Sequence, residues 1–174
     1  NHSSGATVDS VTDYLTGTDK LAFTLNYSAL VSGVTVVADV TTAAAGTSAL
    51  AATLTGNRGQ AVYDTTNSVL NVNVNNDNLM TSLDYQVGIG AASTAANSVV
   101  SADINWTVTG TSSADSITTG SGADTIVTGN GGDTVDSGAG IDTVTGGTGA
   151  DTIDGGTGAD TITGGDGVDS LTGG

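Results

Sequence analysis

Seven aspartates follow one another at intervals of nine residues in the last third of the chain, and they carry its most evident chemistry. They are Asp115, Asp124, Asp133, Asp142, Asp151, Asp160 and Asp169. No Lys, Arg or His lies between Gly110 and Gly174 to neutralise them. Two carboxylates about 4 Å apart repel each other by roughly 1 kcal/mol in water, and by more near a protein surface. Aspartates in this pattern therefore point to a bound hard cation.

Each aspartate is the sixth residue of a nine-residue repeat that starts at Gly110. The eighth residue is apolar in every repeat: Ile117, Ile126, Val135, Val144, Ile153, Ile162 and Leu171. Glycines at the second and fourth positions suit tight turns with positive φ. They are Gly120, Gly122, Gly129, Gly131, Gly138, Gly140, Gly147, Gly149, Gly156, Gly158, Gly165 and Gly167. The short β-branched segments that follow each aspartate suit strands of about three residues.

Alternating turns and strands predict a parallel β-roll in which two repeats complete one coil. Asp115, Asp133, Asp151 and Asp169 would then stack on one flank, and Asp124, Asp142 and Asp160 on the other, about 4.8 Å apart. Calcium accepts carboxylate and carbonyl oxygens together in a flexible shell, whereas magnesium prefers a tighter octahedron and retains water. Zinc and copper prefer His or Cys, which these turns lack. We therefore expect Ca²⁺ to bind the aspartates and the glycine turns.

The repeat resembles GGxGxDxUx, the nonad of the RTX family of secreted calcium-binding proteins, over Gly110–Gly174. The resemblance implies a right-handed roll that folds on calcium outside the cell, after export through a type I secretion system. Within the family, the chain is most similar to surface-layer proteins and adhesins. A flexible acidic linker is the alternative, because Gly-rich acidic tracts with few aromatics are often disordered. The strict phase of the apolar position argues against a linker.

Composition narrows the classes of function. The 174 residues have a net charge of −16, every acidic residue is Asp, and only Lys20 and Arg58 are basic. We therefore expect no nucleic-acid partner and no anionic membrane surface. No apolar run is long enough to span a membrane. The chain has no Cys, no Glu, a single His and no HExxH or GxSxG motif, so we expect no catalysis.

The region before Gly110 does not follow the nine-residue repeat. Residues 1–25 resemble the segment DxIxDFxxGxDxL that often follows an RTX roll, through Asp9, Asp13, Gly17, Asp19 and Leu21. We interpret this region as the cap remnant of a preceding roll, with an acidic loop as the alternative. Residues 26–109 are predicted to form a β domain and residues 110–174 the β-roll.

Strand-like runs separated by Gly and Asn clusters predict an all-β sandwich or meander for this N-terminal part. They are Leu21–Tyr27, Val34–Val40, Ala49–Leu54, Gln60–Tyr63, Val69–Val74, Tyr85–Ile89 and Ala102–Val108. Trp106 is expected to pack between the two parts. Asn73, Asn75, Asp77 and Asp84 have the spacing of a calcium loop, although an Asn-rich hairpin turn explains them as well.

The sequence therefore predicts an all-β, noncatalytic, extracellular calcium-binding module of a surface-layer protein or adhesin, which folds and assembles on calcium. Its expected partners are calcium ions, other copies of itself and other cell-surface molecules. The alternative is the C-terminal export and folding module of a secreted hydrolase such as a protease or lipase.

Overall fold

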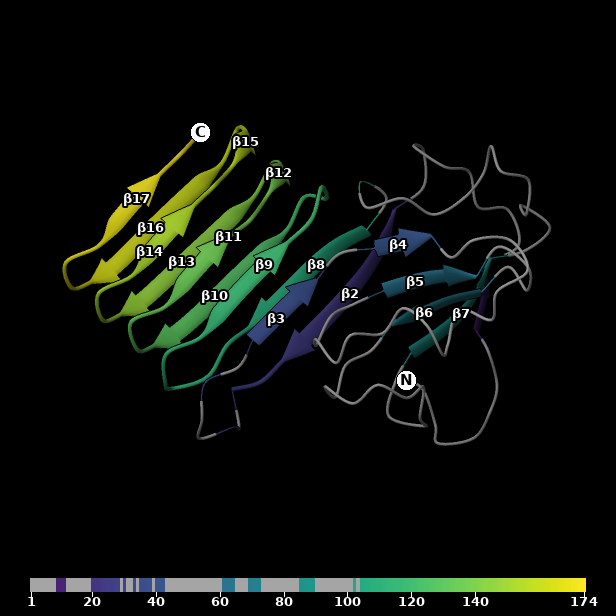
Figure 1. Ribbon diagram of the computed structural model, residues 1–174, viewed down its shortest axis with the longest axis horizontal. Helices are drawn as coiled ribbons and strands as arrows, with labels where there is room; N and C mark the ends of the chain where they lie inside the picture. The colour runs from purple at the N-terminus through teal and green to yellow at the C-terminus, as the bar shows by residue number, and fades with distance from the viewer. Residues whose placement is uncertain are drawn as a thin grey trace.

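The computed structural model describes residues 9–11, 20–28, 30, 33, 35–38, 40–42, 61–64, 69–72, 85–89, 102 and 104–174. The regular elements of this part are all β-strands, as Figure 1 shows. No helix able to span a membrane occurs among these residues.

Most of the described residues form a parallel β-roll with two five-stranded sheets as its long sides. One sheet has the order β16-β13-β10-β8-β2 and the other the order β17-β14-β11-β9-β3. The first sheet contains β2 (Leu21–Asn26), β8 (Ile104–Thr109), β10 (Thr125–Asn130), β13 (Thr143–Thr148) and β16 (Thr161–Asp166). The second contains β3 (Thr35–Ala38), β9 (Ser116–Thr119), β11 (Thr134–Asp136), β14 (Thr152–Asp154) and β17 (Ser170–Thr172). The predicted parallel β-roll is confirmed.

The register of the roll follows the nonads. Ile126 pairs with Val144, and Val144 with Ile162, along one sheet. Val135 pairs with Ile153 along the other. Each step advances by two nonads, so one coil contains one strand of each sheet. A short third sheet joins the turns of two coils through β12 (Ala139–Gly140) and β15 (Thr157–Gly158).

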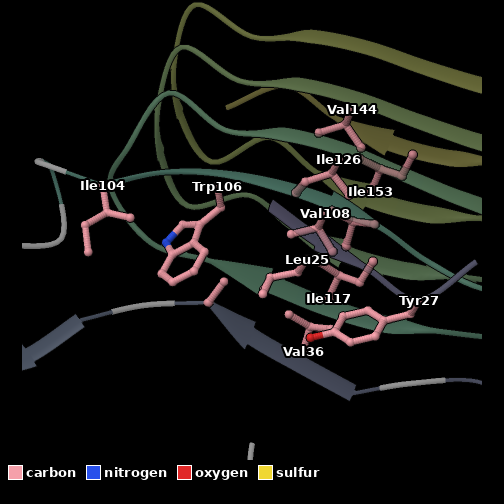
Figure 2. Close-up of a cluster of buried hydrophobic side chains, with 12 residues drawn as sticks. Leu25, Tyr27, Val36, Ile104, Trp106, Val108, Ile117, Ile126, Val144 and Ile153 are labelled. Carbon is pink, nitrogen blue, oxygen red and sulfur yellow. The ribbon is translucent and has the colours of Figure 1, made fainter. Parts of the chain in front are cut away.

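The core of the roll is a row of apolar side chains enclosed between the two sheets (Figure 2). The eighth residue of each nonad points inwards, and Ile117, Ile126, Val135, Val144 and Ile153 are almost completely buried. Residues on either side of each of them are exposed or partly exposed, as the period of two in a strand requires. Each buried Val or Ile contributes about 1.5–3 kcal/mol. At the last coil the row opens to solvent, and Leu171 is 49% exposed.

The roll begins before the first nonad. β8 pairs with β10 on one side and with β2 on the other, and β3 pairs with β9. Leu25 faces Val108, and Val36 faces Ile117, so the apolar row continues through both strands. The predicted division of the chain at residues 25 and 109 stays a prediction. Strands on both sides of these positions contribute to the roll.

Between β3 and β8 the chain supplies strands to a separate sheet, together with the N-terminal strand. Its order is β1-β7-β6-β5-β4. Its strands are β1 (Asp9–Val11), β4 (Val40–Thr42), β5 (Ala61–Asp64), β6 (Val69–Val72) and β7 (Tyr85–Ile89). β5, β6 and β7 are consecutive antiparallel neighbours, which is a meander. The predicted sandwich and the predicted cap remnant stay predictions, and the predicted strand Ala49–Leu54 lies outside the described residues.

Candidate metal centre

Each aspartate of the nonads lies at the end of a turn, directly before a strand of the roll. Asp124 precedes β10, for example, and Asp133 precedes β11. The glycine turn sets the direction of the chain there, and the β-branched residues that follow extend it. The aspartates therefore recur at equivalent places in successive coils.

The aspartates form the two stacks that the sequence predicts, joined by hydrogen bonds. In each stack the backbone N–H of one aspartate donates to Oδ1 of the aspartate in the next coil. The N···O distances are 2.8 Å for Asp115 to Asp133, 2.8 Å for Asp124 to Asp142, 2.9 Å for Asp133 to Asp151, 3.0 Å for Asp142 to Asp160 and 3.0 Å for Asp151 to Asp169. One carboxylate oxygen of each acceptor is thus committed to the fold.

The second carboxylate oxygen has a different environment. Oδ2 of Asp133, Asp142, Asp151 and Asp160 is buried and has no hydrogen-bond partner in the structure. A buried polar atom without a partner costs about 1–3 kcal/mol, and more when it is charged. Four such atoms in equivalent places indicate a missing electrostatic partner of positive charge.

The titration of two central aspartates reflects this environment. Burial raises the pKa of Asp133 above its ordinary value of 3.8, and the charges of Asp115 and Asp151 raise it further. The hydrogen bond from the backbone N–H of Asp115 lowers that pKa in part. Burial likewise raises the pKa of Asp142, with an added contribution from the charge of Asp160. Both carboxylates are therefore less stable in their charged form than they would be in water.

The glycine at the first position of the later nonads lies close against the carboxylate of its own repeat. An atom at the place of a Cβ on Gly146 would lie 2.5 Å from Oδ2 of Asp151 and 2.5 Å from the carbonyl oxygen of Gly164. Oδ2 of Asp151 and a carbonyl oxygen of the next coil thus lie near each other on one side of Gly146, and both are hard oxygen ligands of the kind that calcium accepts.

The turn glycines adopt the backbone conformation that their positions predict, beginning at Gly129. Gly147 and Gly149 have φ of +109° and +132°, and a Cβ on either would collide with a carbonyl of the preceding coil. Positive φ occurs at Gly129, Gly131, Gly138, Gly140, Gly147, Gly149, Gly156, Gly158, Gly165 and Gly167. Gly120 and Gly122 are not among these glycines, although the sequence predicts a positive φ at both. The carbonyl oxygen of Ile104, the first residue of the extended strand β8, lies beneath Gly122.

The sequence also predicts metal ligands outside the nonads. Asn73, Asn75, Asp77 and Asp84 lie outside the described residues, so calcium binding at that loop stays a prediction. Among the residues that the structure describes, no three His, Cys, Asp or Glu side chains meet closely enough to hold a metal. Each proposed site therefore uses backbone carbonyls beside its aspartates.

Sequence reasoning predicted strands at Leu21–Tyr27, Val34–Val40 and Ala102–Val108, but it missed that these strands, which carry no nonad, belong to the roll as β2, β3 and β8. In β8, Trp106 occupies the place of the aspartate, and its backbone N–H donates to Oδ1 of Asp124 at 2.8 Å. In β2, Phe23 pairs with Trp106. Phe23-x-Leu25 and Trp106-x-Val108 keep the spacing between the sixth and eighth positions of a nonad, and this is the signal that could have found them.

The comparison with protein families agrees with this geometry. A model described as "RTX calcium-binding nonapeptide repeat (4 copies)" matches residues 109–144 and 145–174. This part of the chain therefore consists of RTX calcium-binding repeats, the class that its coils and turns define. Searches of curated proteins and of solved structures found no match to the chain.

Proposed function

We propose that this chain is a calcium-binding structural module whose roll is held together by Ca²⁺ in its turns. The observation that carries the proposal is the row of buried Oδ2 atoms without hydrogen-bond partners, on Asp133, Asp142, Asp151 and Asp160. Carbonyl oxygens of the glycine turns, such as that of Gly164, complete the donor set. These are hard oxygen ligands, and they suit calcium better than magnesium or zinc.

The balance of forces in the roll supports a structural role for the metal. Each nonad buries one main apolar side chain, and the roll from Gly110 onward has no cationic side chain to compensate its carboxylates. Bound calcium neutralises those charges and connects successive coils. Because the unfolded chain has no formed site, the free energy of binding becomes free energy of folding.

The proposed location of the module is outside the cell, reached through a type I secretion system. RTX repeats are typical of proteins exported in this way. Calcium sites of extracellular modules bind with dissociation constants of about 10⁻⁴–10⁻³ M. A roll with such sites would stay unfolded at cytosolic calcium and fold after export.

The proposed parent is a surface-layer protein or adhesin in which the module has no catalytic role and associates with other copies or with cell-surface molecules. The charge of −16 keeps separate molecules apart, and calcium would reduce this repulsion. The alternative is a C-terminal export and folding module of a secreted hydrolase, in which the roll would remain monomeric.

Calorimetric titration of the full chain with calcium tests the function, with magnesium as the control ion. We expect several calcium ions to bind with heat and with a gain of β-structure in circular dichroism, and magnesium to bind far more weakly. Asp151→Asn keeps an oxygen acceptor for Asp133 but removes one charge, and it is expected to weaken binding at least about tenfold. Asp154→Asn is the matched control, because Asp154 is exposed on the same nonad. Equal effects of the two variants, or no binding by the parent chain, would reject the proposal.

A further inference from the structure

The N-terminal end of the roll replaces metal ligands with other groups. In the stack that contains Asp124, the next place towards the N-terminus is Trp106, and the place after it is Phe23. The two rings lie 5.4 Å apart between centroids with an interplanar angle of 34°. Trp106 is 1% exposed and contacts the apolar core that Figure 2 shows. Aromatic packing thus occupies the column that holds carboxylates elsewhere in the roll.

The carboxylate of Asp115, the first aspartate of the other stack, accepts hydrogen bonds on both of its oxygens. The backbone N–H of Thr111 donates to Oδ2 of Asp115 at 2.7 Å, and the Thr111 hydroxyl donates to Oδ1 at 3.0 Å. Both residues are buried. Thr111 stands at the second position of its nonad, where later repeats have glycine. The Asp115 carboxylate therefore receives from the protein the contacts that Oδ2 of Asp151 lacks.

Hydroxyl groups also connect the coils directly at the first position of the second, third and fourth nonads. Thr119 donates to the carbonyl oxygen of Ser137 at 3.0 Å, and Ser137 to that of Gly155 at 3.1 Å. Thr128 donates to the carbonyl oxygen of Gly146 in the same way. The fifth, sixth and seventh nonads begin with Gly146, Gly155 and Gly164, which have no hydroxyl. Hydroxyl bonds thus join coils up to β13 and β14, and none of them joins these strands to β16 and β17.

We propose that Trp106 and Thr111 replace calcium at the N-terminal end of the roll, and that the hydroxyls of Thr119, Thr128 and Ser137 reinforce the attachment of this end to the coils that follow. This end is a metal-independent cap made of β2, β3, β8 and β9. Dependence on calcium rises along the roll and is greatest at β16 and β17. The cap presents an ordered edge to the following coil, so calcium-driven folding proceeds from it towards the C-terminus. This inference rests on the proposed calcium binding and specifies which coils need the metal.

The only tryptophan of the chain lies within the cap and reports on it directly. We expect the full chain in a calcium chelator to keep the blue-shifted emission of a buried Trp106, while circular dichroism shows that part of the β-structure is lost. Hydrogen exchange in the chelator is expected to show slow amides in β8 and β9 and fast amides in β16 and β17. Added calcium is expected to slow exchange mainly in the second pair. Exposed Trp106 emission in the chelator, or uniform exchange along the roll, would overturn the inference.

A pair of substitutions separates the role of Thr111 from general effects. Thr111→Val removes the hydroxyl bond to Asp115 and keeps the backbone donor, whereas Thr107→Val makes the same change at an exposed place on β8. In the chelator, Thr111→Val is expected to red-shift Trp106 emission at a lower denaturant concentration than either the parent chain or Thr107→Val. Equal midpoints for the two variants would contradict the assignment. Calcium binding by the parent chain is measured separately. If the chain binds calcium but its N-terminal coils unfold in the chelator, only this inference fails and the proposed function stands.

Discussion

Asp133 donates its backbone N–H to Oδ1 of Asp151 at 2.9 Å, so each carboxylate in the stack also fixes the position of the aspartate in the preceding coil. The side chain of Asp151 therefore has two functions, with Oδ1 bonded to the neighbouring coil and Oδ2 left for a cation. The proposed metal site and the fold can use the same aspartates, because a carboxylate has two oxygens and the hydrogen bond occupies only one of them.

The first prediction compares Asp115→Asn with Asp151→Asn. Asp115 is held by Thr111, so its replacement is expected to leave calcium affinity nearly unchanged and to reduce the free energy of unfolding by about 1.5–3 kcal/mol, the value of a hydrogen bond to a charged group. Asp151→Asn is expected to weaken calcium binding more strongly. Calorimetric titration and thermal unfolding in calcium measure the two effects. A larger loss of affinity for Asp115→Asn would show that the assignment of the stacks is wrong.

The second prediction concerns pH. Because burial raises the pKa of Asp133 and Asp142 in the folded state above 3.8, folding takes up protons at these groups. The resulting stabilisation of the metal-free roll is complete below about pH 3.8 and is lost as the pH rises through the higher folded pKa values. We expect a higher Tm for the metal-free chain at pH 4 than at pH 7, at constant ionic strength.

Asp133→Asn removes one of these titrating groups and is expected to reduce the difference in Tm between the two pH values. Asp154→Asn, which removes an exposed charge, controls for the overall change in net charge. A metal-free chain that is more stable at pH 7 would contradict the assigned direction of the shifts.

The third prediction tests the turn geometry at Gly147. A Cβ there would meet the carbonyl oxygen of Gly129, and φ is +109°, which side chains rarely adopt. Gly147→Ala is expected to reduce the free energy of unfolding in calcium by at least about 1–3 kcal/mol. The control is Gly132→Ala, since Gly132 has no left-handed φ and alanine occupies the fifth position in several nonads. Chemical denaturation of both variants makes the comparison, and equal stability would refute the turn assignment.

The fourth prediction is self-association on calcium. The metal is expected to neutralise much of the negative charge that separates molecules, and to convert monomers into dimers or larger arrays. Sedimentation velocity across a calcium titration measures the change, with magnesium at equal ionic strength as the control. A strictly monomeric chain at saturating calcium would favour the export-module alternative.

Sequence reasoning succeeds where the nonads are regular. The phase of Asp151 and Ile153 is enough to predict both the aspartate stack and the inward row, because a period of eighteen residues leaves one way to superpose the coils. It fails at β2 and β8, where an aromatic residue stands in the place of the aspartate. Phe23 and Trp106 belong to consecutive coils, but they are far apart in the chain, so no local pattern reveals their pairing.

The hydrogen bonds that Asp115 receives from Thr111 could not be predicted from the sequence either. Thr111 reads as a departure from the glycine consensus, and only the geometry shows that its hydroxyl and N–H both reach the carboxylate. The convergence of Asp151 Oδ2 and the Gly164 carbonyl beside Gly146 also depends on the stacking of separate coils.

The departure of the chain from the roll after β3 and its return at β8 have a consequence for how such a protein can diversify. The two strands belong to consecutive coils, so both ends of the intervening segment are anchored on adjacent rungs of one scaffold. A segment attached in this way can be lengthened, shortened or exchanged without a change in the periodicity of the repeats beyond it. The roll then holds the two ends of this segment at fixed positions, whatever the length of the segment.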